Sequence, residues 1–142
     1  MLRLRSKHTE DVHSHLCRAY PEEGCGVLLG REAEGGREIE RVIGLGNVRE
    51  DSRRNRYRIA PGQFLAAERE ARSAGLDVIG FFHSHPDHPS RPSAFDLEHA
   101  WPWYSYLIVS VERDGVKDAR CWRLAEDRSR FEPEDLILDA PR

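Results

Sequence analysis

The sequence predicts one mixed α/β domain spanning residues 1–142, with a sheet that is at least partly antiparallel. Short apolar runs that suit strands outnumber the helical segments, and hairpin turns join several of them. The length of 142 residues fits one domain, and an apolar content of 39% suffices for a packed core. No internal repeat, low-complexity tract or long linker divides the chain.

The first half of the chain begins with an amphipathic segment over residues 6–19. Val12, Leu16 and Ala19 recur there at helical spacing, and Pro21 ends the pattern. A helix is therefore expected, followed by a hairpin and a second helix. In order, the further elements are a buried strand over 25–29, a turn over 34–37, a strand over 38–45, a short strand over 56–60 and a helix from Pro61 to Gly75.

The second half is expected to consist mostly of strands. An apolar, β-rich run over 76–82 leads directly into His83-Ser84-His85-Pro86, and a proline-rich loop follows over 87–92. A brief helix begins at Ser93 and must end before Pro102. The remaining elements are an antiparallel pair over 104–111 and 116–124, and an apolar tail over 131–138 that can dock as a strand or turn.

The overall charge and hydropathy exclude several classes of protein. The chain has 22 basic and 25 acidic residues and a net charge of −3, whereas dedicated nucleic-acid binders are usually basic. No apolar run approaches the length of a membrane span, and the first residues lack the apolar core of a signal peptide. We therefore expect a cytoplasmic protein that binds neither nucleic acid nor membranes. The sequence assigns no oligomeric state.

The three cysteines, Cys17, Cys25 and Cys121, are widely spaced and odd in number. Because no Cys-x-x-Cys pair exists, a cysteine zinc site and a dithiol redox motif are both excluded. All three are expected to be reduced and to act as small buried apolar side chains.

Two histidines and an aspartate form the pattern with the clearest chemistry. Alternate residues of a strand point to the same face, so His83 and His85 can aim at one point. Asp96 lies eleven residues beyond His85, after a loop that three prolines stiffen. Two imidazole nitrogens and a carboxylate oxygen are a common ligand set for catalytic zinc, which leaves a fourth position to water.

Each part of this pattern also has a purely structural interpretation. His13-Ser14-His15 shows the same spacing on the expected first helix, where the two side chains diverge, so this pair is expected at the surface. Ser93 and Asp96 have the form of a helix-capping box, which taken alone is the better interpretation of Asp96. The combination of His-x-His-Pro, a stiff loop and Ser-x-x-Asp is far more specific than any one of its parts.

Hydrolysis at a metal ion also needs a base that takes a proton from water. Glu22 and Glu23 precede the expected strand over 25–29, where a carboxylate is often only a solvated end residue. Over nearly the whole chain, however, the pattern resembles the JAMM motif of the MPN-domain metalloproteases. The matching motifs are Glu23-x-x-Gly26, His83-x-His85-Pro86 and Ser93-x-x-Asp96. Glu22 is out of register with this motif.

The resemblance implies roles for five residues, and it implies a fold. His83, His85 and Asp96 match the family's zinc ligands, so one Zn²⁺ per chain is implied. Glu23 matches its general base, and Ser93 matches the serine whose hydroxyl helps to stabilise the oxyanion. The implied fold is a single MPN (JAMM) domain over residues 1–142, a mixed sheet flanked by helices and similar to that of cytidine deaminases.

The resemblance also implies a reaction. The loop over 87–92 looks like that of the bacterial branch of the family, whose zinc peptidases act on ubiquitin-like sulfur-carrier proteins. The chain is short and leaves little room for the insertions that grip ubiquitin in eukaryotic deubiquitinases. The expected activity is therefore that of a zinc peptidase or isopeptidase. It would hydrolyse an amide bond after the C-terminal Gly-Gly of a small ubiquitin-like sulfur-carrier protein, its expected partner.

Other classes of protein compete with this interpretation. A zinc deaminase of similar fold would need a Pro-Cys-x-x-Cys segment, which the chain lacks. A thiol protease built on Cys25 would leave the spacing of the two histidines and Asp96 unexplained. The strongest rival is a non-catalytic MPN module that binds zinc or a protein partner. Metal content measured together with peptidase activity separates this rival from an enzyme.

Three further features have open interpretations. The stretch from Arg49 to Arg58 holds five arginines and is expected to be a solvated loop and strand edge, with docking of an acidic partner as the alternative. His88 is expected to face solvent, with an extra ligand or a proton shuttle as the alternatives. Four aromatic residues that follow the expected brief helix are expected in a core and sheet cluster, with one of them able to line the substrate groove. They are Trp101, Trp103, Tyr104 and Tyr106.

Overall fold

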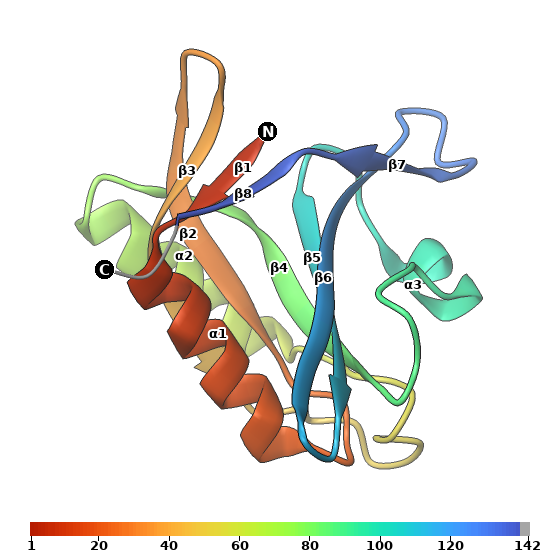
Figure 1. Ribbon diagram of the computed structural model, residues 1–142. Coiled ribbons are helices and arrows are strands. Elements are labelled where there is room, and N and C mark those ends of the chain that lie inside the picture. The colour runs from red at the N-terminus through yellow and green to blue at the C-terminus, as the bar shows by residue number, and fades with distance from the viewer. Residues whose placement is uncertain (140–142) are drawn as a thin grey trace.

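A computed structural model describes residues 1–139 as one eight-stranded mixed sheet with helices on both faces (Figure 1). The strands are β1 (Leu2–Leu4), β2 (Cys25–Ala33), β3 (Gly36–Leu45), β4 (Asp77–Pro86), β5 (Ser105–Glu112), β6 (Gly115–Leu124), β7 (Phe131–Glu134) and β8 (Leu136–Leu138). The helices are α1 (Ser6–Ala19), α2 (Pro61–Ser73) and α3 (Ala94–His99). The strands lie in the order β7-β6-β5-β4-β2-β3-β1-β8.

Strand β4 lies at the centre of the sheet. It pairs antiparallel with β2 and parallel with β5, while β2–β3 and β5–β6 are antiparallel hairpins. A parallel pair needs a crossover connection, which here consists of the proline-rich loop and α3. The sheet is mixed, as the sequence predicts. The connection from β4 to the parallel strand β5 brings α3 back over β4.

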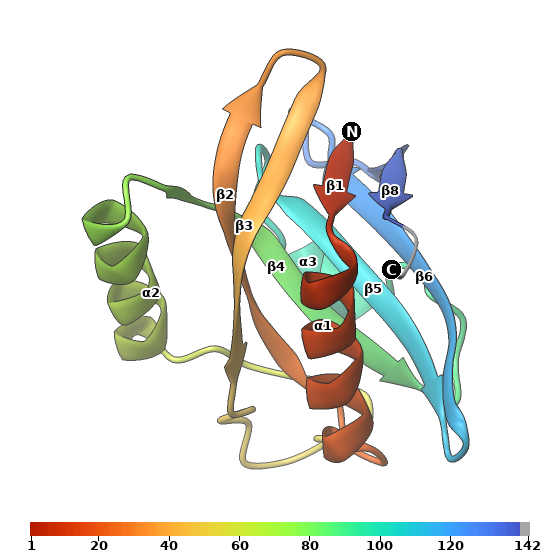
Figure 2. The ribbon, with the colours of Figure 1, turned by 60° about the vertical axis from the view of Figure 1, so that its left-hand side comes forward.

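Apolar side chains pack the two longer helices onto opposite faces of the sheet. Helix α1 buries Val12 and Leu16 against one face, where Phe82 of β4 also lies. Helix α2 buries Ala67 and Ala71 against the other face. Figure 2 shows α1 and α2 on either side of β2 and β3. Because burial of apolar area stabilises the fold by about 25 cal/mol per Å², packing on both faces stabilises β4 at the centre of the sheet.

Most of the predicted elements are confirmed. Helix α1 has the predicted bounds, and β5 and β6 form the predicted antiparallel pair. Strand β4 continues past its predicted end at residue 82 and includes the His-x-His-Pro motif. The tail forms β7 and β8, which pair with β6 and β1 at opposite ends of the strand order. Strand β1 was not expected, because three residues are too few to show a periodic pattern.

The short strand predicted over 56–60 is wrong. This segment has no regular structure, because its main-chain groups bond to a side chain of the neighbouring loop instead of to a strand. The Arg56 carbonyl accepts a hydrogen bond from Asn47 Nδ2, and the Arg58 N–H donates one to Asn47 Oδ1. Asn47 therefore satisfies groups that a strand partner would otherwise satisfy.

Two expectations about burial are corrected as well. Cys17 is exposed, whereas Cys25 and Cys121 are buried as expected. Trp101 and Trp103 are 63% and 45% exposed, so only the two tyrosines of the expected aromatic cluster pack into the core. Within residues 1–139, no helix is long and apolar enough to cross a membrane.

Candidate metal centre

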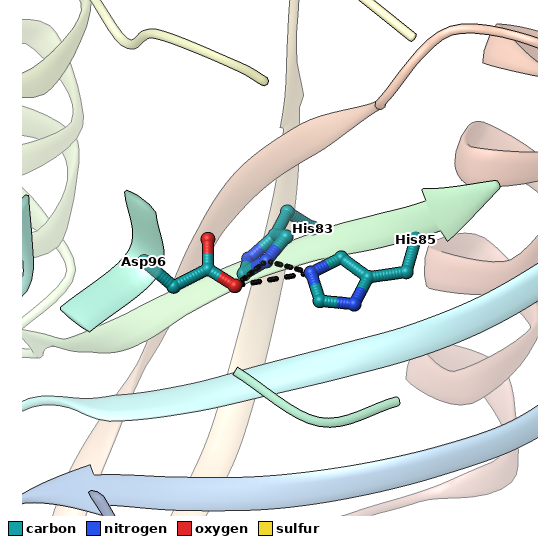
Figure 3. Close-up of side chains that lie close together, drawn as sticks. All are labelled: His83, His85 and Asp96. Carbon is teal, nitrogen blue, oxygen red and sulfur yellow. Dashed lines mark hydrogen bonds and ion pairs between the residues drawn. The ribbon is translucent and has the colours of Figure 1, made fainter. Parts of the chain in front are cut away.

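Strand β4 places two imidazoles side by side. From Phe81 onward its residues alternate between the faces of the sheet, so His83 and His85 both lie on the face that α3 covers (Figure 3). His83 is 1% exposed and His85 is 6% exposed. The strand thus aims both side chains at one point, as the sequence predicts, and its two neighbouring strands hold it there.

The proline-rich loop after β4 is fastened to the neighbouring strands. The Ser110 hydroxyl of β5 donates a hydrogen bond to the His88 carbonyl at 2.6 Å. On β6, the Trp122 indole donates to the Ser90 carbonyl at 3.0 Å, and Asp118 accepts from the Ser90 hydroxyl at 2.5 Å. These bonds fix the path of the loop, so that it directs α3 back toward the two histidines.

Asp96, in the first turn of α3, completes the cluster (Figure 3). Its Oδ2 lies 3.3 Å from His83 Nε2 and 3.0 Å from His85 Nε2, and the two Nε2 atoms are 3.1 Å apart. Ligand bonds of about 2.0–2.1 Å around a tetrahedral ion separate the ligand atoms by ~3.3 Å. The three atoms are therefore spaced like one face of such a tetrahedron, and these residues could hold a metal ion.

Main-chain groups orient His85 and Asp96. The Nδ1–H of His85 donates to the Pro89 carbonyl at 2.9 Å, so in the neutral ring the lone pair of Nε2 faces the cluster. Asp96 Oδ2 accepts a hydrogen bond from the Ser93 N–H at 2.9 Å, and Ser93 Oγ accepts one from the Asp96 N–H at 3.0 Å. The capping-box interpretation of Ser93 and Asp96 is thus confirmed, and the same carboxylate oxygen also faces the imidazoles.

The surroundings of Asp96 and His85 shift their pKa values in opposite directions. Burial alone would raise the pKa of Asp96, but the neighbouring His83 charge and the hydrogen bonds of the cluster hold it well below its usual range. Burial lowers the pKa of His85, but the hydrogen bond and the charge of Asp96 outweigh it and raise the pKa above its ordinary value. The cluster therefore favours a cation, which can be a proton or a metal ion.

Glu23 lies beside the cluster because of the pairing of β2 with β4. The antiparallel register places Cys25 opposite His83, and a further main-chain hydrogen bond continues the pairing, so Glu23 lies across from His85. Glu23 is 4% exposed, and its Oε1 has no hydrogen-bond partner among the described residues. Glu22 is exposed, as its position out of register predicts.

Burial dominates the ionisation of Glu23. It raises the pKa of Glu23 to about 8, while His85 opposes the rise and Asp96 adds to it. A buried carboxyl without a hydrogen-bond partner that titrates near neutral pH is able to accept and release a proton in a reaction.

We expect this carboxyl to make the metal-free protein less stable as the pH rises. With a pKa of about 8 in the folded chain and 4.5 in the unfolded chain, protonated Glu23 favours folding fully below pH 4.5. This contribution is lost as the pH rises from 4.5 through 8. Glu23→Gln removes this titration, so its free energy of unfolding should not show this loss as the pH rises. Relative to wild type, the variant should therefore become more stable by a few kcal/mol between low and high pH, at ~1.4 kcal/mol per pKa unit.

Urea unfolding of both chelator-treated proteins, near pH 5 and near pH 8.5, measures this difference. Glu22→Gln is the matched control and should follow the wild-type pH dependence, because Glu22 is exposed. Identical pH slopes for wild type and Glu23→Gln would contradict the raised pKa.

A cavity of about 790 Å³ opens beside His83 and Asp96. Its lining is largely aromatic and also includes two arginines; among these residues are Tyr57, Phe81, Phe95, Trp101, Tyr104, Tyr106, Arg49 and Arg58. The guanidinium carbons of Arg49 and Arg56 lie 5.2 and 5.0 Å from the centre of the Phe95 ring. The arginine stretch is therefore a loop at the rim of the cavity and not a strand edge.

Some contacts of this region are not evident from the sequence. Tyr57 stacks on His83, with ring centroids 4.6 Å apart, although only arginines drew attention to its segment. His15, expected at the surface, is half-buried, and its Nε2 lies 2.9 and 3.1 Å from main-chain carbonyls of β2 and β3. That expectation is wrong because Gly44 has no side chain and leaves room for the imidazole. His88 is exposed, as expected.

The sequence is similar to those of several named proteins. A probable TtuB-protein conjugate cleaving protease of Thermus thermophilus is 37% identical over 76% of this chain and 68% of its own length. A desampylase of Haloferax volcanii is 39% identical over 72% of this chain and 70% of its own. A CysO-cysteine peptidase of Mycobacterium bovis is 28% identical over 96% of this chain and 92% of its own.

Solved structures share the fold. A protein of Desulfitobacterium hafniense, 34% identical, matches with a TM-score of 0.86 over 99% of this chain and 94% of that chain. A JAB1/MPN domain protein of Archaeoglobus fulgidus, 19% identical, matches with a TM-score of 0.61 over 97% of this chain and 98% of that chain. Residues 5–125 match the model of the prokaryotic homologues of the JAB domain. The chain therefore belongs to the JAB/MPN family, as its JAMM-like motifs predict.

Proposed function

We propose that this protein is a zinc-dependent peptidase or isopeptidase that hydrolyses the amide bond after the C-terminal Gly-Gly of a small ubiquitin-like sulfur-carrier protein. One observation carries the proposal: three potential ligand atoms within 3.3 Å of one another lie beside a buried carboxyl with a pKa of about 8. A structural metal site is usually closed by four protein ligands and needs no base, whereas three ligands and a base suit hydrolysis.

Zinc is the metal that this donor set suits best. His83, His85 and Asp96 would be its three ligands, because two imidazole nitrogens and one carboxylate oxygen in a compact arrangement are typical of catalytic zinc. When bound, the ion would supply Lewis-acid polarisation of the scissile carbonyl and would make a water molecule more acidic.

Two side chains of the protein would handle protons and charge. Glu23 Oε1 would accept a proton from the attacking water and then deliver it to the amine that leaves. Ser93 Oγ already accepts a hydrogen bond from the Asp96 N–H, so its own hydrogen is free to be donated to the oxyanion that develops at the carbonyl. Ser93 is exposed at the start of α3, where a substrate can reach it.

Removal of the Ser93 hydroxyl should lower kcat. We expect Ser93→Ala to reduce kcat by ~10²-fold with little change in KM, the usual size of an effect at an oxyanion donor. The Ser93 N–H bond to Asp96 uses the main chain and should survive. Steady-state kinetics, combined with thermal unfolding, measures both quantities. Normal specific activity with only the ~1 kcal/mol loss of a helix cap would show that Ser93 is a cap alone.

The substrate class rests on the relatives together with the aromatic lining of the cavity. One relative is named a probable TtuB-protein conjugate cleaving protease and another a CysO-cysteine peptidase. A Gly-Gly tail has no side chains that would collide with the aromatic walls of the cavity beside His83 and Asp96. Edge pairing with a strand would add main-chain hydrogen bonds to hold the tail.

A carrier protein with one cysteine added after its C-terminal Gly-Gly provides the test. Mass spectrometry should show loss of that single residue, and both a metal chelator and Glu23→Gln should block it. Glu22→Gln should retain the activity. If this adduct stays intact while unrelated peptides are cut, the carrier proposal fails and the peptidase proposal survives. If no amide is cut by the zinc-loaded protein, the non-catalytic MPN module becomes the better interpretation.

A further inference from the structure

The two histidines of the cluster are held in different ways. His85 has the hydrogen bond from Nδ1 to the Pro89 carbonyl that usually fixes a ligating imidazole. His83 has no such bond, because its Nδ1 is buried and has no partner among the described residues. Since His83 is 1% exposed and lacks this bond, packing contacts determine the orientation of its ring.

Tyr57 makes such a contact. Its ring stacks on the His83 imidazole, with centroids 4.6 Å apart and an angle of 26° between the planes. The stack restricts rotation of the imidazole about its side-chain bonds, which is what the hydrogen bond does for His85. None of the hydrogen bonds among residues 1–139 uses the Tyr57 hydroxyl, so the contact depends on the ring and not on the phenol oxygen.

Asn47 holds the segment that carries Tyr57. Its Nδ2 donates hydrogen bonds to the carbonyls of Glu23 and Arg56, and its Oδ1 accepts bonds from the N–H groups of Arg49 and Arg58, all at 3.0 or 3.1 Å. The amide thus uses its full capacity of two donors and two acceptors. Because Arg56 and Arg58 flank Tyr57 in the chain, these bonds fix the main chain on both sides of the stacking ring.

The same loop also holds the main chain of the proposed base. The Glu23 N–H donates to the Arg53 carbonyl at 2.6 Å, and the Glu23 carbonyl accepts from Asn47 at 3.0 Å. Both peptide groups of Glu23 are therefore bonded to the segment over 47–58. A single loop consequently sets the position of Glu23 and of His83, which lie on different strands or strand ends.

We infer that Tyr57 is a positioning residue of the metal centre, which orients His83 by ring stacking, and that Asn47 fastens Tyr57 in place. The inference rests on the proposed metal site. It assigns a role in zinc affinity to a loop that contains none of the proposed ligands. Removal of the stacking ring should weaken zinc binding by about 10–100-fold, as for other groups that orient a ligand.

Zinc affinity of the full chain, measured by competition with a chromogenic chelator, tests the inference independently of activity. Tyr57→Phe keeps the ring and should bind zinc as wild type does, whereas Tyr57→Leu should bind about 10–100-fold more weakly. Asn47→Ala should show a loss in the same direction. The visible spectrum of the cobalt-substituted proteins should change for Tyr57→Leu and not for Tyr57→Phe, since it reports the geometry of the ligands.

Two control variants separate this role from general effects on the fold. Tyr104→Leu alters another half-buried tyrosine of the cavity wall, which packs on Phe81 and not on His83, and it should leave zinc affinity unchanged. Gln63→Ala removes a different amide that ties this region together, through bonds to Ala60 and Gly46, and it should also leave the affinity unchanged.

Wild-type affinity in Tyr57→Leu would overturn the inference while leaving the proposed zinc site intact. An equal loss in Tyr57→Phe would also overturn it, because the hydroxyl and not the ring would then matter. A loss in Tyr104→Leu as large as that in Tyr57→Leu would assign the effect to the cavity wall as a whole and reject the specific stack. Absence of zinc binding in the wild type, by contrast, would reject the proposed function itself.

Discussion

His85→Ala and Asp96→Asn should each remove most of the bound metal and abolish turnover. Each variant deletes or neutralises one of three potential ligand atoms that lie within 3.3 Å of one another. Loss of a group that only orients a ligand costs 10–100-fold in affinity, so loss of a ligand should cost more than ~100-fold. Elemental analysis of the purified proteins measures the metal directly, and cleavage of the carrier adduct measures turnover.

His88→Ala is the matched control for these two variants. His88 is a third histidine in the same loop region, but its side chain is exposed, and its hydrogen bonds to Ser110 and to the His85 carbonyl use main-chain groups that the substitution keeps. It should keep one metal ion per chain and wild-type activity. Full metal content in both His85→Ala and Asp96→Asn would place the metal elsewhere and reject this centre. Thermal unfolding of all three variants tests whether the losses come from misfolding.

Glu23→Gln should lose turnover by about 10²–10⁴-fold, the usual contribution of general acid–base catalysis, and should keep its metal. The amide has nearly the shape of the carboxyl, but it cannot accept a proton at Oε1. Because Glu23 is 4% exposed and its Oε1 has no partner within the described chain, few other contacts depend on the charge. Single-turnover cleavage of the carrier adduct at saturating enzyme isolates the chemical step.

Glu22→Gln tests the register of the motif. Glu22 is exposed one residue before Glu23, so its substitution should be nearly silent. If the two glutamine variants exchange their phenotypes, the motif has been aligned one residue out of place. If Glu23→Gln loses its metal together with its activity, Glu23 is a ligand and not a base.

The parts of the site that follow from periodicity could be predicted from the sequence. His83 and His85 share a face because residues two apart in a strand do so, and β4 extends far enough to include both. Asp96 could be placed at a helix start from its capping box with Ser93. These rules act over a few residues, so they can be applied to the sequence without knowledge of the rest of the fold.

The parts that depend on contacts distant in sequence could not be predicted. Tyr57 contacts His83 because Asn47 forms hydrogen bonds to the main chain on both sides of it. The alternation of residues 56–60 in the sequence predicts a strand instead. Gly26 of the Glu-x-x-Gly motif shows the same limit. A Cβ there would overlap the Phe82 ring, a reason for glycine that appears only once β2 and β4 are paired.

The hydrogen bond between His85 and the Pro89 carbonyl has a consequence for how this loop can vary. A carbonyl group is common to all amino acids, so exchange of the residue at position 89 for another of compatible backbone geometry leaves the acceptor in place. Insertions and deletions between His85 and Ser93, by contrast, would move the acceptor away from the imidazole. Tolerance to mutation in this loop should therefore follow its length more closely than its residue identities, and a library of length variants should lose activity sooner than a library of point substitutions.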